Sequence, residues 1–176
     1  QANKINFPEN NDYEVVERKG VGHPDTIADR LAEKISIEYS KYCLKKFHII
    51  LHHNVDKVTV MGGLVEIKDW GKAKMKKPIR VLINGRMSNS FGDIKIPVKK
   101  IIKKTVNDQL HKILPHLNIH KWLKIMIETT TYSKNPRFFK PLSVEDLPEQ
   151  KNPYANDTSA VVGYWPLTPS EQLPIK

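Results

Sequence analysis

The sequence has a single cysteine, Cys43, and no long apolar run. One cysteine cannot form an internal disulfide, so a reducing, cytoplasmic setting is expected. No apolar segment approaches the roughly 20 residues that a membrane-spanning helix needs, and no signal peptide is visible. These absences predict a soluble cytoplasmic protein with no membrane partner.

Acidic residues are also scarce relative to basic ones. The 176 residues include 29 Lys and Arg against 19 Asp and Glu, which gives a formal net charge of +10. Such an excess favours anionic partners, including nucleotides, polyphosphate and nucleic acid. The lysines are not interleaved with aromatic residues in the way that nucleic-acid binding predicts, so nucleic acid is the less favoured of these partners.

What the sequence does contain is a dense polar stretch, residues 17–29, at the start of a predicted helix. Apolar residues recur there at helical spacing: Ile27, Leu31, Ile35, Tyr39 and Tyr42. Pro24 suits the first helical position, where its missing N–H costs nothing. His23 is therefore expected at the cap, with Asp25 in the first turn. Cys43 falls within the same helix pattern and is expected to be buried.

The chemistry of this helix start favours phosphate. The free N–H groups and the dipole of a helix start attract anions, and Gly20 and Gly22 permit a tight turn and a close backbone approach. Asp25 could hold a hard cation such as Mg²⁺, which commonly also binds substrate phosphates. His23 could donate to a leaving oxygen. The alternative is a helix capped by His23, with Asp25 placed to complement the dipole.

The motif VERKG at residues 16–20, followed by GHPDTIAD at residues 22–29, resembles a signature of the archaeal-type S-adenosylmethionine synthetases (methionine adenosyltransferases). Further blocks follow in the family's order: His52–Lys57, Gly62–Gly63, Pro78–Ile79 with Gly85–Arg86, and Ala155–Ser159 with Gly163–Tyr164. The chain is similar to the N-terminal portion of that family.

The resemblance implies a transferase of one-carbon metabolism that joins ATP and methionine. Sulfur attacks the ribose C5′ carbon, and the released triphosphate is hydrolysed to phosphate and diphosphate. Because the nucleophile is neutral and needs no base, catalysis depends on alignment and on stabilising the charge of the leaving group. This predicts His23 as the catalytic residue beside the leaving oxygen and Asp25 as the Mg²⁺ ligand. K⁺ is a second candidate cofactor.

Substrate contacts are expected from two further places. The resemblance implies that Asp157, with Asn156, binds substrate at the methionine end, whereas the residues alone fit an Asx-turn with no ligand. Glu17 and Lys19 are additional substrate-binding candidates, and their alternative is an ordinary strand-end surface. The family works as a homodimer with active sites between subunits, so a second copy or a second chain is expected to complete the site.

The element pattern predicts an α+β fold of order β-α-β-β-β-α-β, with helices on one face of a mainly antiparallel or mixed sheet. The expected strands are Tyr13–Glu17, Phe47–Leu51, Val55–Met61, Leu64–Ile67, Pro78–Asn84 and Trp122–Thr131. The expected helices are Pro24–Lys46 and Pro97–Leu110, the second ended by Pro115. The resemblance implies that this unit is one of three arranged around a pseudo-threefold axis.

The predicted domain plan has four parts: an N-terminal arm (1–12), a first α/β unit (13–132), a connection (133–153) and the start of a second unit (154–176). Near the end, Thr168 or Ser170 is expected to cap a helix.

Two departures from the family pattern keep other functions open. Gly71 stands alone where the family has a run of glycines, and residues 128–134 lack the family's Asp and glycine-bearing loop. The first hypothesis is an incomplete N-terminal chain of an active enzyme. The second is a degenerate homologue that serves as a binding or regulatory subunit, and the third is a basic nucleic-acid-associated module.

Overall fold

The computed structural model describes residues 12–69, 71–147 and 166–173. The chain divides into two compact units: residues 20–153 form the larger one, and residues 1–19 with 154–176 form the smaller. No helix in the described ranges is both long and apolar enough to cross a membrane.

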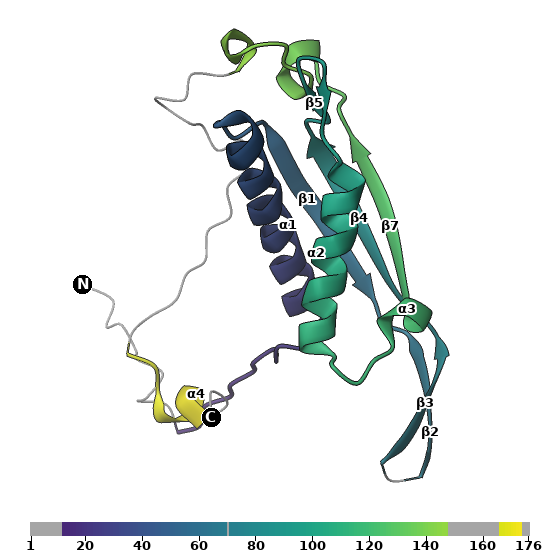
Figure 1. Cartoon of the computed structure of the whole chain (residues 1–176). Helices are drawn as coiled ribbons and strands as arrows, with labels where there is room; N and C mark the ends of the chain where they lie inside the picture. The colour runs from purple at the N-terminus through teal and green to yellow at the C-terminus, as the bar shows by residue number, and fades with distance from the viewer. Residues whose placement is uncertain (1–11, 70, 148–165, 174–176) are drawn as a thin grey trace, which may run out of the picture. The chain divides into compact units, whose positions relative to one another are not determined.

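The larger unit begins with a long helix and continues through strands of one sheet and two small ribbons (Figure 1). Its helices are α1 (Pro24–Phe47), α2 (Val98–Ile113) and α3 (Ile119–Trp122). Its strands are β1 (His53–Met61), β2 (Leu64–Asp69), β3 (Lys72–Lys77), β4 (Ile79–Met87), β5 (Ser90–Phe91), β6 (Ile94–Lys95) and β7 (Leu123–Thr130). Short 3₁₀ turns follow at Pro136–Phe139 and Val144–Asp146.

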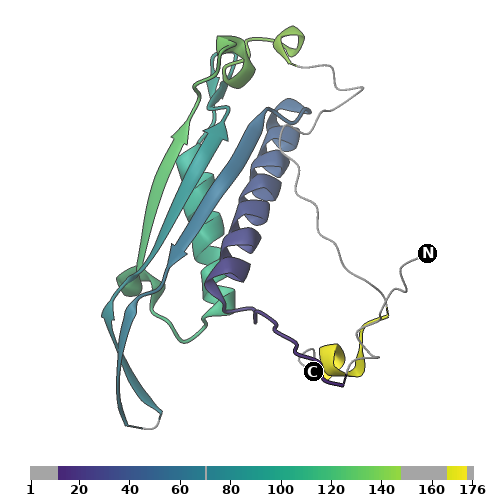
Figure 2. The ribbon, with the colours of Figure 1, turned by 180° about the vertical axis from the view of Figure 1, so that it is seen from behind.

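The main sheet has the order β1-β4-β7 and is mixed. Strands β1 and β4 pair antiparallel, whereas β4 and β7 pair parallel and are connected through α2. Strands β2 and β3 form one two-stranded ribbon, and β5 and β6 form another. Figures 1 and 2 show α1 and α2 together on one face of the sheet. The α+β prediction, with helices on one face of a mixed sheet, is confirmed.

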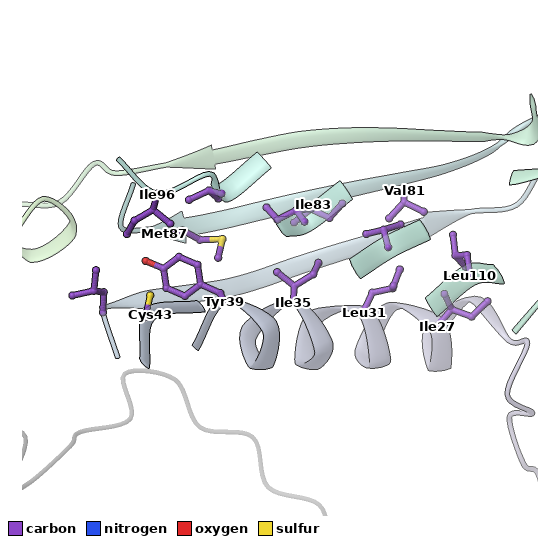
Figure 3. Close-up of a cluster of buried hydrophobic side chains, with 14 residues drawn as sticks. Ile27, Leu31, Ile35, Tyr39, Cys43, Val81, Ile83, Met87, Ile96 and Leu110 are labelled. Atoms are coloured by element: carbon purple, nitrogen blue, oxygen red, sulfur yellow. The ribbon is translucent and has the colours of Figure 1, made fainter. Parts of the chain in front are cut away.

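The core lies between this helix layer and the sheet (Figure 3). Helix α1 contributes a stripe at four-residue spacing, which is the spacing of one helix face: Ile27, Leu31, Ile35, Tyr39 and Cys43. Strand β4 contributes alternate residues, because successive side chains of a strand point to opposite faces: Val81, Ile83 and Met87. Cys43 is buried as predicted, and burial raises the pKa of its thiol, which disfavours the reactive thiolate.

Two predicted strands are wrong. Residues 13–17 carry no strand, and the apolar run 47–51 is mostly the end of α1 and its exit. The helix runs to Phe47 and is capped by His48, whose φ of 60° is left-handed, with its N–H bonded to the Leu44 carbonyl. Phe47 packs against the rings of Tyr42 and Phe91, so its apolar character serves the helix end rather than a strand.

Strand β3 is the longest element that the sequence prediction missed; the short β5, β6 and α3 were missed as well. Its residues are Lys-Ala-Lys-Met-Lys-Lys. The family resemblance indicated a loop here, although Ala73 and Met75 keep the period of two of a strand. Gly71, whose φ of 82° suits glycine, lies in the connection from β2.

In the smaller unit the described residues include the short helix α4 (Pro169–Gln172). Thr168 is its cap: the hydroxyl accepts from the Glu171 N–H and donates to the Glu14 carboxylate, while the Glu171 carboxylate accepts from the Thr168 N–H. Of the two predicted caps, Thr168 is therefore the one used.

Candidate functional site

The start of α1 has the cap geometry that the sequence predicts. His23 has extended backbone angles (φ −66°, ψ 138°), and Pro24 is the first helical residue. The His23 N–H donates to the Gly20 carbonyl at 3.0 Å, and its own carbonyl accepts from the Ile27 N–H at 2.9 Å. These bonds close the turn before the helix and fix the backbone on both sides of His23.

The imidazole of His23 is held by the backbone of the first turn. Its Nδ1 accepts from the Asp25 N–H at 3.2 Å, so in the neutral ring the proton is on Nε2. Nδ1 lies 3.9 Å from the nearer Asp25 carboxylate oxygen, and the two side chains are 41% and 61% exposed. Nε2–H is therefore the ring atom that can donate to a ligand oxygen while Nδ1 keeps its bond to the helix.

Gly20 and Gly22 leave open space beside this helix start. A Cβ added at either position would meet no atom of the chain within 4 Å, and neither backbone is left-handed. Contacts within the described chain therefore do not require glycine there. Close approach of a ligand to this backbone remains the prediction that would explain both glycines.

The other predicted site residues lie in the smaller unit or outside the described residues. Glu17 and Lys19 belong to the smaller unit, and both are exposed. Asn156 and Asp157 lie outside the described residues. Their roles in binding substrate stay predictions.

The fit of a metal can be judged from the side chains present. Among the described residues, no group of three or more His, Cys, Asp or Glu side chains could enclose an ion. Mg²⁺, however, often takes only one or two carboxylates and fills its other positions with water and substrate phosphates. Asp25 fits that second kind of site, in which the cation is bound together with a phosphate ligand.

The adjacent pair His52 and His53 has a structural rather than a ligand-binding environment. His53 Nδ1 donates to the Leu51 carbonyl at 2.9 Å, and Nε2 accepts from the Ser36 hydroxyl at 2.7 Å. Its ring centroid is 4.7 Å from that of Tyr39. Burial lowers the pKa of His53. Both ring nitrogens have partners, so His53 anchors β1 to α1 as a neutral imidazole.

His52 instead joins an aromatic cluster that the sequence prediction missed. Its ring centroid is 4.0 Å from Phe138 and 4.8 Å from Phe139, and the Arg86 guanidinium carbon is 5.3 Å from the Phe139 centroid. Burial lowers the pKa of His52, and the nearby His53 and Arg86 lower it further. The cluster holds the 3₁₀ turn Pro136–Phe139 against the ends of β1 and β4, and so it shapes one end of the sheet.

The Gly85–Arg86 pair has a clear structural reason. A Cβ at Gly85 would lie 2.2 Å from the Asn54 carbonyl oxygen, so β1 can approach β4 here only because residue 85 is glycine. The strand register is irregular between Asn54 and Lys57 at the same level. Arg86 therefore follows a tightly constrained backbone position.

Comparisons with known proteins identify the family to which the chain belongs. The chain matches the S-adenosylmethionine synthetase (AdoMet synthetase) family along residues 1–176 and belongs to that family. Its relatives include archaeal synthases, as expected of the archaeal-type branch.

Three relatives illustrate the range of similarity. A Streptococcus pyogenes serotype M3 protein described as uncharacterised is 44% identical over 167 residues, which cover 94% of this chain and 42% of the relative. The S-adenosylmethionine synthase of Methanoregula boonei is 40% identical over 161 residues, covering 91% and 38%. That of Pyrobaculum neutrophilum is 39% identical over 167 residues, covering 93% and 40%. The chain thus spans about two fifths of the length of these relatives.

Proposed function

We propose that this chain contributes to methionine adenosyltransferase activity, in which ATP, methionine and water give S-adenosylmethionine, phosphate and diphosphate. The observation that carries the proposal is the helix start of α1 in a member of this family. There His23 caps the helix through Nδ1, which leaves Nε2–H as its ring donor, and Asp25 lies in the first turn. A cytoplasmic location is part of the same proposal.

In this proposal His23 donates through Nε2 to the oxygen that leaves C5′ with the triphosphate. The bond from the Asp25 N–H to Nδ1 keeps the ring in the tautomer that carries the needed proton. The first-turn N–H groups and the helix dipole add positive potential for the triphosphate. Asp25 would hold Mg²⁺, which when bound supplies further positive charge to the phosphates; K⁺ is the second candidate cation.

The same proposal assigns substrate contacts to Glu17, Lys19, Asn156 and Asp157. Because the chain spans about two fifths of its relatives' length, we also propose that residues outside it complete the site, in a homodimer or from a second polypeptide. The proposal therefore does not require this chain to catalyse the reaction alone.

A second candidate is a binding or regulatory subunit without turnover. The specific observation is the departure from the family pattern: Gly71 stands alone where the family has a run of glycines, and residues 128–134 lack the family's Asp and glycine-bearing loop. In that case the helix start would bind nucleotide without transferring its adenosyl group.

Formation of S-adenosylmethionine by the purified protein, with ATP, methionine, Mg²⁺ and K⁺, tests the proposal. We expect product and an equal amount of phosphate. Saturable ATP binding without product would support the regulatory subunit. Neither binding nor product, in a sample shown to be folded and to contain any co-purifying polypeptide, would contradict both.

A further inference from the structure

A hollow of about 400 Å³ lies where the β2–β3 hairpin joins the main sheet. Its lining includes the backbone of Gly62 and Gly63 and three cationic side chains, Lys77, Arg80 and Lys124. No Asp or Glu lines it. Its volume is within the roughly 300–1,000 Å³ of small-molecule sites in proteins. The proposed adenosyl transfer uses none of these residues.

The three cationic side chains are brought together by the tertiary fold, because they are not neighbours in the sequence. Arg80 of β4 and Lys124 of β7 are direct partners in the parallel register, although 44 positions separate them along the chain (124 − 80). Both are exposed and alternate with Val81 and Ile125, which are turned toward the helices. Like charges directly opposed on one sheet face are destabilising, so this pair has a cost within the protein.

That cost is not offset by a carboxylate in the described part of the chain. In that part of the chain Lys41, Lys76 and Lys104 form ion pairs with carboxylates, and no such pair includes Lys77, Arg80 or Lys124. Lys76 pairs with Glu66 at 2.8 Å, so the Glu66 carboxylate of the hairpin is already engaged by a different lysine. A bound anion would balance the three charges.

The backbone wall of the hollow is also closely fitted. A Cβ on Gly63 would lie 2.4 Å from the Lys77 carbonyl oxygen and 3.3 Å from the Ile79 nitrogen, so glycine allows the hairpin to close against the start of β4. Pro78, between β3 and β4, restricts the chain at the same level. These constraints position Lys77 and Arg80 on a defined frame.

We propose that this hollow binds a small phosphate-chain anion with two or more negative charges, at a site separate from the helix start of α1. Arg80 supplies a planar guanidinium that can bond two phosphate oxygens at once, and the lysines add point charges. Inorganic diphosphate and the phosphate chain of a nucleotide share this chemistry, and the titration below separates them. The proposal does not rest on the proposed transferase activity.

The test is an NMR titration of the ¹⁵N-labelled protein with inorganic diphosphate, and in parallel with ATP, both without Mg²⁺ and at fixed ionic strength. We expect the amides of Gly62, Gly63 and Leu64 to shift and to saturate. Arg80→Gln should weaken diphosphate binding about tenfold or more, as expected for the loss of a charge-assisted bond. Lys124→Gln should weaken it in the same direction. Tighter binding of ATP than of diphosphate would assign the site to nucleotide phosphates, and tighter binding of diphosphate would assign it to the free anion.

The matched control is Lys103→Gln, which removes the same charge from an exposed position on α2 outside the hollow. It should leave diphosphate affinity within about twofold of that of the unchanged protein. The melting temperature is a second readout, which shows whether each variant is folded. Without ligand, Arg80→Gln should melt no lower than the unchanged protein, because it removes a like-charge opposition. Diphosphate should raise the melting temperature of the unchanged protein more than that of the variant.

Shifts spread over all lysine-rich surfaces, or equal weakening by Lys103→Gln and Arg80→Gln, would overturn the proposal and leave only diffuse attraction to a basic protein. Absence of saturation would overturn it as well. The outcome is separable from that of the transferase assay, because His23→Ser should leave the shifts of Gly62 and Gly63 unchanged.

Discussion

Helix α1 and the β2–β3 hairpin belong to the same unit but are stabilised in opposite ways. One face of α1 is buried along most of its length, from Ile27 to Cys43. The hairpin has no fully buried residue among those described, and it exposes Val65 and Ile67 together with its lysines. In Figures 1 and 2 it extends beyond the end of the main sheet. The packed layer of α1 and the main sheet therefore carries the proposed catalytic helix start, whereas the hairpin contributes charge and exposed surface.

The largest expected difference between α1 and the hairpin is in the free energy of unfolding. Leu31 of α1 is 0% exposed and Ile67 of β2 is 75% exposed. Leu31→Ala should destabilise by about 2–5 kcal/mol, because it leaves a cavity in the core, whereas Ile67→Ala should cost less than about 0.5 kcal/mol. Urea denaturation measures both. Equal losses would mean that the hairpin is part of the core.

A second prediction concerns the buried polar link between α1 and the chain after β4. The Tyr39 hydroxyl donates to the Ser88 carbonyl at 2.7 Å, and both residues are fully buried. Tyr39→Phe leaves that carbonyl unsatisfied and should cost about 1–3 kcal/mol. Tyr132→Phe, at an exposed position, is the control and should change the free energy of unfolding very little. No loss for Tyr39→Phe would show that the link is unimportant for stability.

The cap of α1 should have a smaller effect on stability. His23→Ala removes the acceptor for the Asp25 N–H and should cost about 1 kcal/mol, whereas His23→Ser replaces it with a preferred cap and should restore most of that loss. Denaturation of the two variants measures the difference. If they are equally stable, the Nδ1 bond is not what holds the helix start.

The buried imidazole of His53 predicts how stability depends on pH. Its folded-state pKa is below the ordinary value, so the unfolded chain binds more protons between the two pKa values. The contribution of neutral His53 to the free energy of unfolding should therefore be complete above about pH 6.5. It should decrease as the pH falls through that value toward the folded pKa. His53→Gln should flatten this slope, and His116→Ala, at an exposed position, should not. An unchanged slope in His53→Gln would assign the dependence to another group, His52 first.

The smallest effect is expected in the hairpin. The Lys76–Glu66 ion pair, at 2.8 Å, links β2 to β3, but both side chains are more than two fifths exposed. Glu66→Gln should cost no more than about 1 kcal/mol, and the cost should shrink in high salt. Thermal melts at low and high salt measure it. A loss comparable to that of Leu31→Ala would contradict the contrast between the hairpin and α1.

The sequence predicted α1 and the start of the site because the signals there are local. Pro24, the four-residue apolar spacing and the polar cap all lie within a few turns. The run 47–51 misled because a short apolar run cannot be distinguished from a helix end by periodicity alone. Strand β3 was missed because the family resemblance indicated a loop there, despite the alternation of Ala73 and Met75.

Other features could not be predicted because they depend on distant parts of the chain. The contact of His52 with Phe138 and Phe139 needs the loop after β7 to fold back onto β1. The pairing of Arg80 with Lys124 exists only once β4 and β7 are in parallel register. No local pattern encodes either arrangement.

The most direct test of the central claim is the rate of S-adenosylmethionine formation by the unchanged protein, His23→Ser and His116→Ala under identical ATP, methionine and Mg²⁺ concentrations. His23→Ser keeps a helix cap but removes the imidazole donor, whereas His116→Ala removes an exposed imidazole outside the site. We predict that His23→Ser loses at least about a hundredfold in rate, as expected for the loss of a general acid, and that His116→Ala retains the full rate. Equal rates for all three proteins would contradict a catalytic role for the helix start.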